Sequence, residues 1–576
     1  MSITRLSNVA LACAIALLPC FVAAQQTVTT YSPVTDARLL NPEPHNWLMY
    51  RGTYDGHGYS PLDQINPGNV KKLRPVWTFS SELVEGHQAP PIVNNGIMFV
   101  STPQNQVLAL NAKNGDLLWR YKRELPDDIA QPHPTNRGVA LYEDKVYLAT
   151  MDAHVVALDA KTGTVVWDTA VDDPRKGYYY TLAPLVAKGK VMIGSSGGEY
   201  GVRGYVAALD ARTGKEVWRT YTIPAPGEPG SETWQGDTWK TGGGSVWITG
   251  HFDPKLNLTY WGTGNPSPWV SDMHPGDSLF TASVIALDVD TGKMKGYHQY
   301  HHGDTWDWDE VSAPLLIDVQ RGGRTIKSLV HPARNGYLWL LERGADGIKF
   351  VDAKPFVKHN VFTQIDPKSG RPTYDIEKVL VTGKSATFCP SHWGGKDWPP
   401  AAYNPKTQLL YVPAHENLCS TLKSMDKKPD YEAGKRYVGT DAAATKVFQQ
   451  PGTDHIGELQ AWDMNTGKKV WTHTYKTVNW GPVLTTGGGL VFSGGSSDRY
   501  FRAFDAKSGK KLWEFRTNSG VTGVPSSFAV DGVQYIAVQS GWGIDAQKMI
   551  ARLDQSGGTQ TFVPQGGVVW VFALQD

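Results

Sequence analysis

Two carboxylates stand two residues apart in the segment HHGDTWDWDE, at residues 301–310. If this segment is a strand, the side chains of Asp307 and Asp309 point to the same side. Two like charges in that arrangement repel each other unless one is protonated or a cation lies between them. The pair therefore indicates a cation site, although a solvated acidic loop explains these two residues equally well when they are taken alone.

Three further segments combine glycines with one distinctive residue. In SSGGEYGVRG, the glycines around Glu199 allow a ligand to approach the backbone closely. In TGGGSVW, a triple glycine leads to Trp247, an indole that could lie beneath a flat ligand. In WGTGNPSPW, the proline holds Asn265 extended and leaves its amide oxygen available to a hard cation. Each segment alone has a simpler explanation, namely a glycine-rich hairpin, a bulged strand or an Asn-Pro turn.

All of the candidate donors in these segments are oxygen atoms. Carboxylate and amide oxygens suit Ca²⁺ or another hard ion, and they do not suit zinc. A site built from oxygen donors of this kind, such as the amide of Asn265 with the acidic pair, therefore favours a hard cation.

A repeated pattern, Ala-x-Asp-x-x-Thr-Gly-x-x-x-Trp, predicts the scaffold that must position these segments. The apolar run before Asp predicts a strand, and Asp with Thr-Gly predicts a tight turn. The next strand carries a Trp, which can pack between neighbouring sheets. Copies of the pattern lie at residues 109–119, 157–167, 208–218, 461–471 and 503–513, with degenerate copies at 286–296, before Phe350 and before Trp77.

The eight copies predict an all-β protein, an eight-bladed β-propeller. Spacings of 42 to about 50 residues between several copies match one four-stranded sheet per repeat. The wide gaps between 218 and 296 and between 350 and 471 are expected to hold insertions. The last apolar run, residues 568–574, has no following hairpin, so we expect it to join the first N-terminal strand and close the ring. Periodicity alone leaves a solenoid as the alternative.

The N-terminus predicts export. Arg5 precedes an apolar stretch that ends in Val22-Ala23-Ala24, a small-residue cleavage site. This stretch is shorter than the roughly 20 residues that a membrane span requires. We therefore expect residues 1–24 to be a signal peptide and residues 25–576 to form a single periplasmic propeller domain. The formal net charge of +1 provides no general attraction for a nucleic acid or an anionic membrane.

Cysteine positions agree with an oxidising compartment. Cys13 and Cys20 lie in the predicted signal peptide, so that Cys389 and Cys419 remain in the mature chain. A disulfide between these two would close a loop of about thirty residues and contribute on the order of 3 kcal/mol. The sequence contains no Cys-x-x-Cys-His, the attachment motif of c-type haem, and we expect no haem.

Together these segments resemble one family, the pyrroloquinoline-quinone (PQQ)-dependent alcohol dehydrogenases, which include methanol and ethanol dehydrogenases and are eight-bladed propellers. The likeness extends from NWLMYRGTYDGHGYSPLDQINPGNV, residues 46–70, to SGWG, residues 540–543. The combination of GGExGVRG, GGGSxW, GTGNPxPW and WDWD carries it. The repeated Trp pattern is similar to the motif that docks the blades of that family.

The resemblance implies a role for each matching residue. It implies that Glu199 and Asn265 bind a metal, that Asp307 is the catalytic base and also lies at the metal, and that Trp247 stacks on the quinone. Arg334 matches an arginine near the reactive carbonyls of the quinone. Further quinone contacts are implied for Arg137, Thr181, Ser196, Gly197, Gly198 and Ser245, with weaker outer contacts for Asp397, Trp398 and Trp480.

Two positions depart from the family pattern. Gln131-Pro132 stands where the family usually has adjacent cysteines that cover the quinone, and in this respect the chain looks more like members that act on larger alcohols or sugars, such as sorbose or polyvinyl alcohol dehydrogenases. Asp309 occupies a position that is acidic in lanthanide-dependent members. An additional anionic donor favours a trivalent ion on charge grounds. In the alternative, Asp309 bonds to a loop and Ca²⁺ occupies the site.

The function that the resemblance implies is oxidation of an alcohol to an aldehyde or ketone, with electrons passed to an external cytochrome c or a similar acceptor. Two other classes remain open at this point. A non-catalytic scaffold of the outer-membrane assembly type has the Trp repeats but does not require Glu199, Asn265 or WDWD. A sugar-binding or hydrolytic propeller uses paired carboxylates but leaves GVRG and GGGSVW unexplained.

Overall fold

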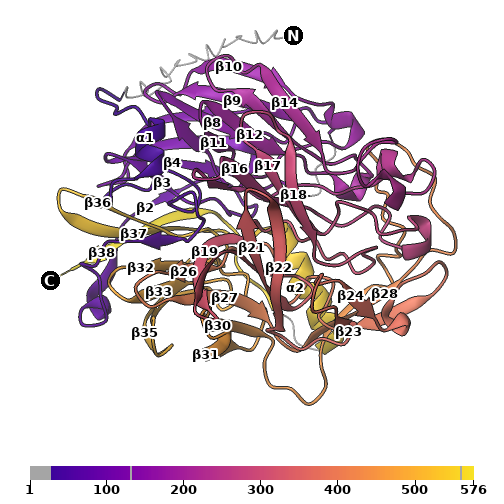
Figure 1. Ribbon diagram of the computed structural model, residues 1–576. Helices are drawn as coiled ribbons and strands as arrows, with labels where there is room; N and C mark the ends of the chain where they lie inside the picture. Colours follow the sequence, from indigo (N-terminus) through magenta and orange to yellow (C-terminus); the bar gives the residue numbers. More distant parts are fainter. Residues whose placement is uncertain (1–27, 130–132, 558–560, 576) are drawn as a thin grey trace, which may run out of the picture.

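The computed structural model describes residues 28–129, 133–557 and 561–575. The predicted signal peptide lies outside the described residues. Figure 1 shows β-sheets that follow one another around the molecule. The described residues form seven four-stranded sheets and one five-stranded sheet, besides a two-stranded and a three-stranded sheet. The chain is therefore an all-β propeller, as the repeat predicts.

The first four sheets along the chain are each built from consecutive antiparallel strands. They are β3–β6 (Ile92–Asn94, Ile97–Thr102, Gln106–Asn111, Leu117–Lys122), β7–β10 (Ala140–Tyr142, Lys145–Ala149, His154–Asp159, Val165–Ala170), β11–β14 (Leu185–Ala187, Lys190–Gly194, Tyr205–Asp210, Glu216–Tyr221) and β15–β18 (His251–Asp253, Leu258–Gly262, Ser283–Asp288, Met294–Gln299).

In the second half of the chain, long insertions and the N-terminal strands enter the sheets. These sheets are β19–β22 (Leu315–Arg321, Arg324–Pro332, Tyr337–Gly344, Gly347–Pro355), β26, β27, β30 and β31 (Ala402–Asn404, Leu409–His415, Gly457–Asp463, Lys468–Tyr475), β1 with β32–β35 (Tyr59–Ser60; Leu484–Thr486, Leu490–Ser493, Tyr500–Asp505, Lys511–Arg516) and β2 with β36–β38 (Leu73–Ser80; Ser526–Val530, Val533–Ser540, Val568–Leu574).

The two ends of the chain meet in one sheet. Strand β38 pairs antiparallel with β2, with Leu574 opposite Leu73 and Val568 opposite Ser80. Figure 1 shows β38 of the C-terminal end beside β2 of the N-terminal end. The predicted pairing of the terminal strands is therefore present.

The repeated tryptophans bridge neighbouring sheets. Nε1 of Trp119, on β6, donates a hydrogen bond to the carbonyl of Ala160 at 3.0 Å, which follows β9 in the next sheet. Its ring also covers Gly163: a Cβ at that glycine would lie 2.5 Å from the ring. Equivalent bonds to the next sheet are made by Trp77, Trp167, Trp218, Trp471 and Trp513.

The strand order decides where functional side chains gather. In an antiparallel four-stranded sheet, the turn between the second and third strands lies at the same end as the link to the next sheet. Glu199, Asn265 and Arg334 lie in turns between the second and third strands of their sheets, after β12, β16 and β20. The tight turns of the repeat lie at the opposite end. Links between sheets carry Arg137, Thr181, Trp247, Asp307 and Asp309.

The insertion after β22 forms a small substructure with a helix against it. It contains the hairpin β23–β24 (Phe362–Ile365, Pro372–Tyr374) and the sheet β25-β28-β29 (Ser385–Phe388, Leu418–Lys423, Lys446–Gln449). A disulfide joins Cys389 to Cys419, so that predicted pairing is confirmed.

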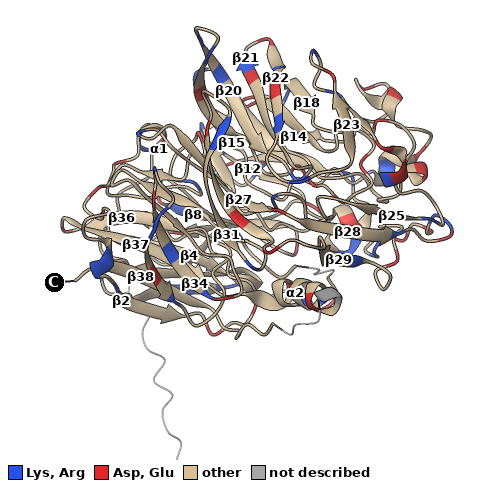
Figure 2. Cartoon of the chain, turned by 90° about the horizontal axis from the view of Figure 1, so that it is seen from below, with Lys and Arg blue, Asp and Glu red and all other residues tan. Residues whose placement is uncertain are grey.

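Two helices interrupt the strands, and the sequence patterns predicted neither. Helix α1 (Asp36–Leu40) is one short turn, and α2 (Gly543–Gly557) is longer. Ile550 and Leu553 of α2 share an apolar cluster with Trp393, Trp480 and Trp542. No helix in the described part of the chain is long and apolar enough to span a bilayer. Figure 2 shows that acidic and basic residues are both spread over the molecule.

Candidate active site

The acidic segment is a loop, so the strand geometry considered for Asp307 and Asp309 does not apply. Residues 301–314 form no β-ladder between β18 and β19, and Asp307 has a φ of 64°. The reason is a third carboxylate: Oδ1 of Asp304 accepts the backbone N–H groups of residues 306, 307 and 308 at 3.2, 3.0 and 3.3 Å. A short acidic side chain that bonds nearby amides in this way competes with the sheet.

Asp304 is itself fixed by a buried histidine. Nε2 of His301 lies 2.7 Å from Oδ2 of Asp304, and both side chains are fully buried. Nδ1 of the same ring lies 3.2 Å from the side-chain amide of Asn335. Because the carboxylate accepts from Nε2–H, the ring accepts from Asn335 at Nδ1. The turn that carries Asp307 therefore rests on a bonded network of buried side chains.

The two tryptophans of the WDWD motif anchor the loop. Trp306 and Trp308 are fully buried, and their rings stack with centroids 4.9 Å apart. Nε1 of Trp306 donates to the carbonyl of Lys378 at 2.6 Å, and Nε1 of Trp308 donates to that of Ser391 at 2.9 Å. Both indoles are thus bound to the insertion.

Asp309 connects three of the predicted segments. Its Oδ1 accepts the backbone N–H of Asn265 at 2.8 Å, and its Oδ2 accepts Nε1–H of Trp247 at 2.9 Å. The side-chain nitrogen of Asn265 donates to the carbonyl of Pro266 at 3.0 Å, which leaves the amide oxygen for another partner. Burial, with a smaller contribution from the charge of Glu199, raises the pKa of Asp309 to about 6.

The carboxylates of this region disfavour one another's ionisation. Burial raises the pKa of Asp307 well above its usual range, and the charge of Asp309 raises it further. The charge of Glu199 acts in the same direction on both aspartates. In the described part of the chain, no three His, Cys, Asp or Glu side chains stand close enough to hold an ion by themselves. Glu199, Asp307 and Asp309, the three carboxylates of the predicted donor set, do not form such a group in this structure, and the donor set with the amide of Asn265 stays a prediction.

Arg334 is the cation next to these carboxylates. Its Nη2 donates to Oδ1 of Asp397 at 2.7 Å and its Nη1 donates to the backbone carbonyl of Asp307 at 3.2 Å. The guanidinium lies 5.8 Å from the ring centroid of Trp247. Although burial opposes its charge, Asp397, Asp309 and Asp307 raise the pKa of Arg334. Arg334 in turn lowers the pKa of Asp307.

The backbone before Arg334 is held by a second buried pair. Oε2 of Glu310 accepts the N–H of Arg334 at 3.0 Å, and Oε1 accepts that of Asn335 at 3.2 Å. Nε2 of His331 lies 2.8 Å from Oε2 of the same carboxylate. Burial opposes the ionised form of Glu310, but His331, His301 and the N–H of Arg334 together outweigh it, so that the pKa of Glu310 is lowered.

A second arginine lies over Trp247 from another sheet. Nη1 of Arg137 donates to Oγ1 of Thr181 at 2.6 Å, and its guanidinium lies 4.8 Å from the ring of Trp247 and 4.9 Å from that of Trp398. Nε of Arg137 is buried without a hydrogen-bond partner. Burial lowers the pKa of this arginine to about 10.

The remaining predicted contacts lie around Thr181 and the loop of Glu199. Oγ of Ser196 lies 3.5 Å from Oγ1 of Thr181. Gly197 has a φ of 107°, and a Cβ there would lie 2.1 Å from the carbonyl oxygen of Gly177, so this position requires glycine. A Cβ at Gly198 would lie 3.0 Å from Oγ of Ser245.

Trp480 stands apart from this group. Trp398 shares an apolar cluster with the residues that pack against Trp247. Trp480 belongs to the cluster beneath α2, with its ring 5.6 Å from Trp393 and 5.5 Å from Trp542. Gln131 and Pro132 lie outside the described residues, so the departure from the family at that position stays a prediction.

Comparison with known proteins decides the family. Residues 47–354 and 378–536 match the family described as PQQ: Glucose/ethanol/alcohol dehydrogenase, beta-propeller domain. The chain belongs to the PQQ-dependent alcohol dehydrogenases. It is 38% identical to the quinoprotein alcohol dehydrogenase PedH of Pseudomonas putida, over 93% of this chain and 92% of that protein.

Two further relatives have names that specify an acceptor and a metal. The methanol dehydrogenase [cytochrome c] subunit 1 of Methylobacterium organophilum is 36% identical, over 93% of this chain and 92% of that protein. The solved structure of a europium-containing methanol dehydrogenase superposes with a TM-score of 0.87 at 35% identity, and the match covers 93% of this chain and 99% of that one. The protein is therefore a quinoprotein that oxidises alcohols.

Sequence reasoning missed the residues that support this quinoprotein site. Asp304 and Glu310 flank the WDWD motif, but neither belongs to a pattern that predicted a role for it. A signal was available in Asp304, because an Asp two or three residues before a bend commonly bonds the following amides. The partner histidines His301 and His331 carry no local signal, because they meet the carboxylates through the fold.

Proposed function

We propose that this enzyme works in the periplasm, where it oxidises an alcohol to an aldehyde or ketone with Asp307 as the general base and passes the electrons to a separate cytochrome c. The observation that supports the base assignment is the position of Asp307. It is a half-buried carboxylate with the charge of Arg334 beside it, and its backbone is fixed by Asp304 and Arg334.

The residues of the site fit both a metal ion and the quinone. The charge of Glu199 disfavours ionisation of Asp307 and Asp309, and Asp309 disfavours that of Asp307; a cation beside these two aspartates reverses that effect. The free amide oxygen of Asn265 completes an oxygen donor set. The unpartnered Nε of Arg137 suits a carboxylate of the quinone, beside the exposed part of Trp247. When bound, the quinone supplies a hydride acceptor and the metal a Lewis acid.

The chain's own groups perform the proton transfer and the positioning. Asp307 accepts the hydroxyl proton of the alcohol, and the charge of Arg334 favours its ionised form. Arg334 is oriented by Asp397 at 2.7 Å and stabilises negative charge that develops beside it. Buried aromatic side chains around the loop limit access of water to Asp307.

We take the seven four-stranded sheets and the five-stranded sheet as eight blades, docked through the bonds of the repeated tryptophans to the next sheet. The sequence lacks the attachment motif of c-type haem, so the electrons are assigned to an external acceptor. The relative whose name specifies cytochrome c supports that choice.

Substitution of the base tests the mechanism. General-base catalysis contributes roughly 10²–10⁴-fold, so we expect Asp307→Asn to lower kcat at least 100-fold while PQQ is still bound, as followed by its absorbance after gel filtration. Asp116→Asn, in an exposed turn, is the matched control. If Asp307→Asn kept more than a tenth of the activity, the base would have to be another residue.

For the metal, we favour a lanthanide because Asp309 adds a third anionic donor to Glu199 and Asp307. In this structure both oxygens of Asp309 accept hydrogen bonds, which is also what the Ca²⁺ alternative requires. Dye-linked oxidation of primary, secondary and sugar alcohols, with PQQ and either Ca²⁺ or La³⁺, distinguishes the two. The lanthanide is supported if La³⁺ restores more activity than Ca²⁺ and if Asp309→Ser loses the activity with La³⁺ but not that with Ca²⁺. Equal or better activity of the natural protein with Ca²⁺ contradicts it.

The location is tested by the mature N-terminus. We expect the protein from the periplasmic fraction to begin at Gln25, as determined by N-terminal sequencing. Retention of residues 1–24 on active protein in the cytosolic fraction would contradict export.

A further inference from the structure

A second group of buried cations lies around a cavity beside the cluster that supports Trp247. Tyr50, Ile248 and Trp398 belong both to the cavity wall and to that cluster. The polar side chains that line the cavity include those of Arg51, Thr249, His251, Ser312, His331 and Lys396. Tyr50 also lines it, and its hydroxyl is buried without a hydrogen-bond partner. Among the described residues that line it, none is a carboxylate.

Arg51 is a buried charge that lacks a counterion in the described part of the chain. Its side chain is among the largest that are fully buried, at 2% exposure. Nη2 donates to the carbonyl oxygens of Ala401 and Val483, both at 2.8 Å, whereas Nε and Nη1 have no partner. No described carboxylate influences its pKa, which burial lowers to about 10, so the guanidinium stays charged at neutral pH.

The other cation of the cavity is Lys396, which is also 2% exposed. Its Nζ donates to Oγ of Ser312 at 3.1 Å and to the carbonyl of Asp397 at 2.8 Å. An ammonium has three N–H donors, so one remains for a ligand. The carboxylate of Asp397 is engaged by Arg334 at 2.7 Å and does not serve as its partner.

The nearby carboxylates are each paired elsewhere. Asp55 lies 3.2 Å from Nδ1 of His57, and Glu310 lies 2.8 Å from Nε2 of His331. No carboxylate therefore lines the cavity beside Arg51 and Lys396, although the charges of Asp397 and Glu310 favour the charged form of Lys396. A water molecule satisfies an N–H group but does not neutralise a charge, and a buried charge without a partner is strongly destabilising.

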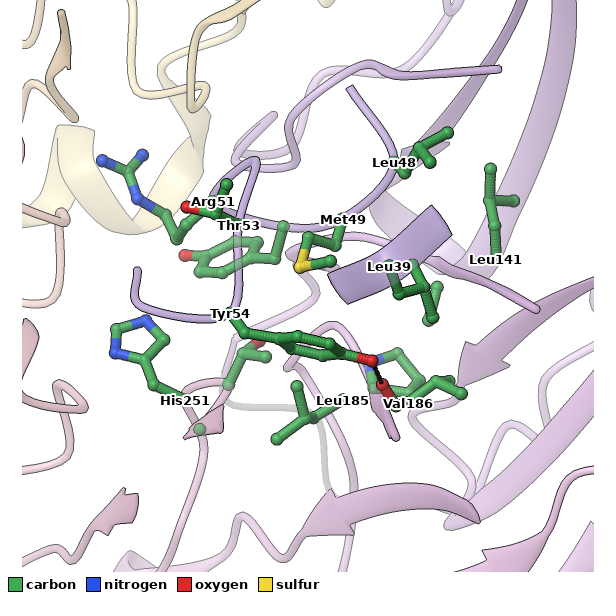
Figure 3. Close-up of a pocket in the computed structure, with 15 residues that line it drawn as sticks. Leu39, Leu48, Met49, Arg51, Thr53, Tyr54, Leu141, Leu185, Val186 and His251 are labelled. Atoms are coloured by element: carbon green, nitrogen blue, oxygen red, sulfur yellow. Dashed lines mark hydrogen bonds between the residues drawn. The ribbon is translucent and has the colours of Figure 1, made fainter. Parts of the chain in front are cut away.

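The size of the cavity limits the ligand. It has about 20 Å³ of space for the centre of a water-sized molecule, and one water needs roughly 10–15 Å³ on that measure. Figure 3 shows a neighbouring pocket that shares Arg51 and His251, which lie together on one side of it, whereas Leu39, Leu48 and Leu141 lie on the other. A polar ligand is thus confined to the end at Arg51.

We propose that Arg51 and Lys396 hold a small monovalent anion, of halide or formate size, that contacts Nε and Nη1 of Arg51 and the remaining N–H of Lys396. The anion neutralises a guanidinium whose Nη2 ties the N-terminal segment to residues next to β26 and β32. The anion therefore stabilises the contact between the sheets of β26 and β32, independently of alcohol oxidation.

Crystals of the holoenzyme grown in sodium bromide give the direct test. We expect an anomalous peak within hydrogen-bond distance of Nε and Nη1 of Arg51. Electron density for water alone at that place, without anomalous signal, would overturn the proposal.

Thermal unfolding of the holoenzyme in solution gives the second test. At constant ionic strength, we expect the Tm to rise saturably when sodium gluconate, whose anion is too large for the cavity, is replaced by sodium chloride, bromide or formate. The anion that acts at the lowest concentration identifies the preferred class. A Tm that is the same in gluconate and in all three small anions would contradict the site.

Variants assign the effect to Arg51. Arg51→Met places an apolar side chain of similar length in the cavity, a replacement that buried ionic sites often tolerate; it should abolish the anion-specific rise in Tm and the anomalous peak. Arg212→Met, in an exposed turn, should keep both. If Arg51→Met retained the full anion-specific rise, the site would lie elsewhere; if that variant did not fold, the bromide peak of the natural protein decides.

Discussion

The indole Nε1 of Trp247 donates a hydrogen bond of 2.9 Å to Oδ2 of Asp309, and this bond joins the aromatic face of the site to its acidic loop. It lowers the pKa of Asp309, against the effect of burial. Trp247→Phe keeps an aromatic ring and removes the donor. Because hydrogen bonds to charged groups contribute about 1.5–3 kcal/mol, we expect the apparent metal affinity to fall by about tenfold or more.

Metal titration of apoenzyme reconstituted with PQQ measures this change. Trp167→Phe is the control, because its indole bonds to a carbonyl in the next sheet, away from the acidic loop. An unchanged metal affinity in Trp247→Phe would show that the bond to Asp309 does not tune the metal site.

Asp304 is expected to act as a positioning residue for Asp307. Its carboxylate accepts the amides of residues 306, 307 and 308, and Asp304→Ala releases the turn that holds Asp307. Displacement of a catalytic group by about 1 Å can cost 10²-fold in rate, so we expect kcat to fall by about that factor. Asp304→Asn keeps one acceptor oxygen and should recover part of the loss.

Steady-state kinetics and circular dichroism of the two Asp304 variants separate positioning from folding. A purely structural role would lower the Tm and the active fraction of both variants without a difference in kcat per PQQ bound. Recovery by Asn and not by Ala is the result that supports positioning.

Local patterns predicted the scaffold because each repeat contains both partners of its contacts. The Trp that crosses to the next sheet and the Gly that receives it recur in one motif, as Trp119 and Gly163 show. The motifs also identified Glu199, Trp247, Asn265 and Asp309, which the fold brings together. Their functional roles stay predictions.

Features that depend on tertiary contacts could not be predicted from the sequence. The alternation of Trp and Asp in residues 306–309 suggested a strand, but Asp304 bonds the following amides and makes a loop. Helix α2 has 15 residues, and its residues Ile550 and Leu553 gain apolar partners from an insertion more than a hundred residues earlier. Nothing in the segments of Arg51 and Lys396 indicates that they line one cavity, because that cavity exists only in the fold.

The disulfide is expected to stabilise the insertion that holds the acidic loop. Cys389 precedes Ser391, whose carbonyl accepts from Trp308, and Cys419 lies on β28. A closed loop of 30 residues corresponds to about 3–4 kcal/mol in the chain-entropy estimate. The Cys389→Ser and Cys419→Ser double variant should therefore unfold at lower denaturant concentration, and reductant should have the same effect on the natural protein but none on the variant.

Lys396 should make stability depend on pH. Burial lowers its pKa from the ordinary value near 10.5 to about 7. Between these two pH values the unfolded chain binds a proton that the folded chain does not, so the free energy of unfolding rises with pH. At about 1.36 kcal/mol per unit, the rise from pH 7 to pH 10.5 amounts to roughly 4 kcal/mol, and below pH 7 the contribution is constant.

The comparison of the natural protein with Lys396→Met isolates this contribution, because other titrating groups are common to both. In gluconate buffer, denaturant unfolding at several pH values should show Lys396→Met losing its relative stability as the pH rises from 7 to 10.5. Lys215→Met, in an exposed turn, should show no such trend. Chloride should narrow the pH range over which this trend occurs, because an anion in the same cavity favours the charged form of Lys396 and raises its pKa in the folded state. A difference between Lys396→Met and the natural protein that does not change with pH would show that Lys396 keeps an ordinary pKa in the folded state.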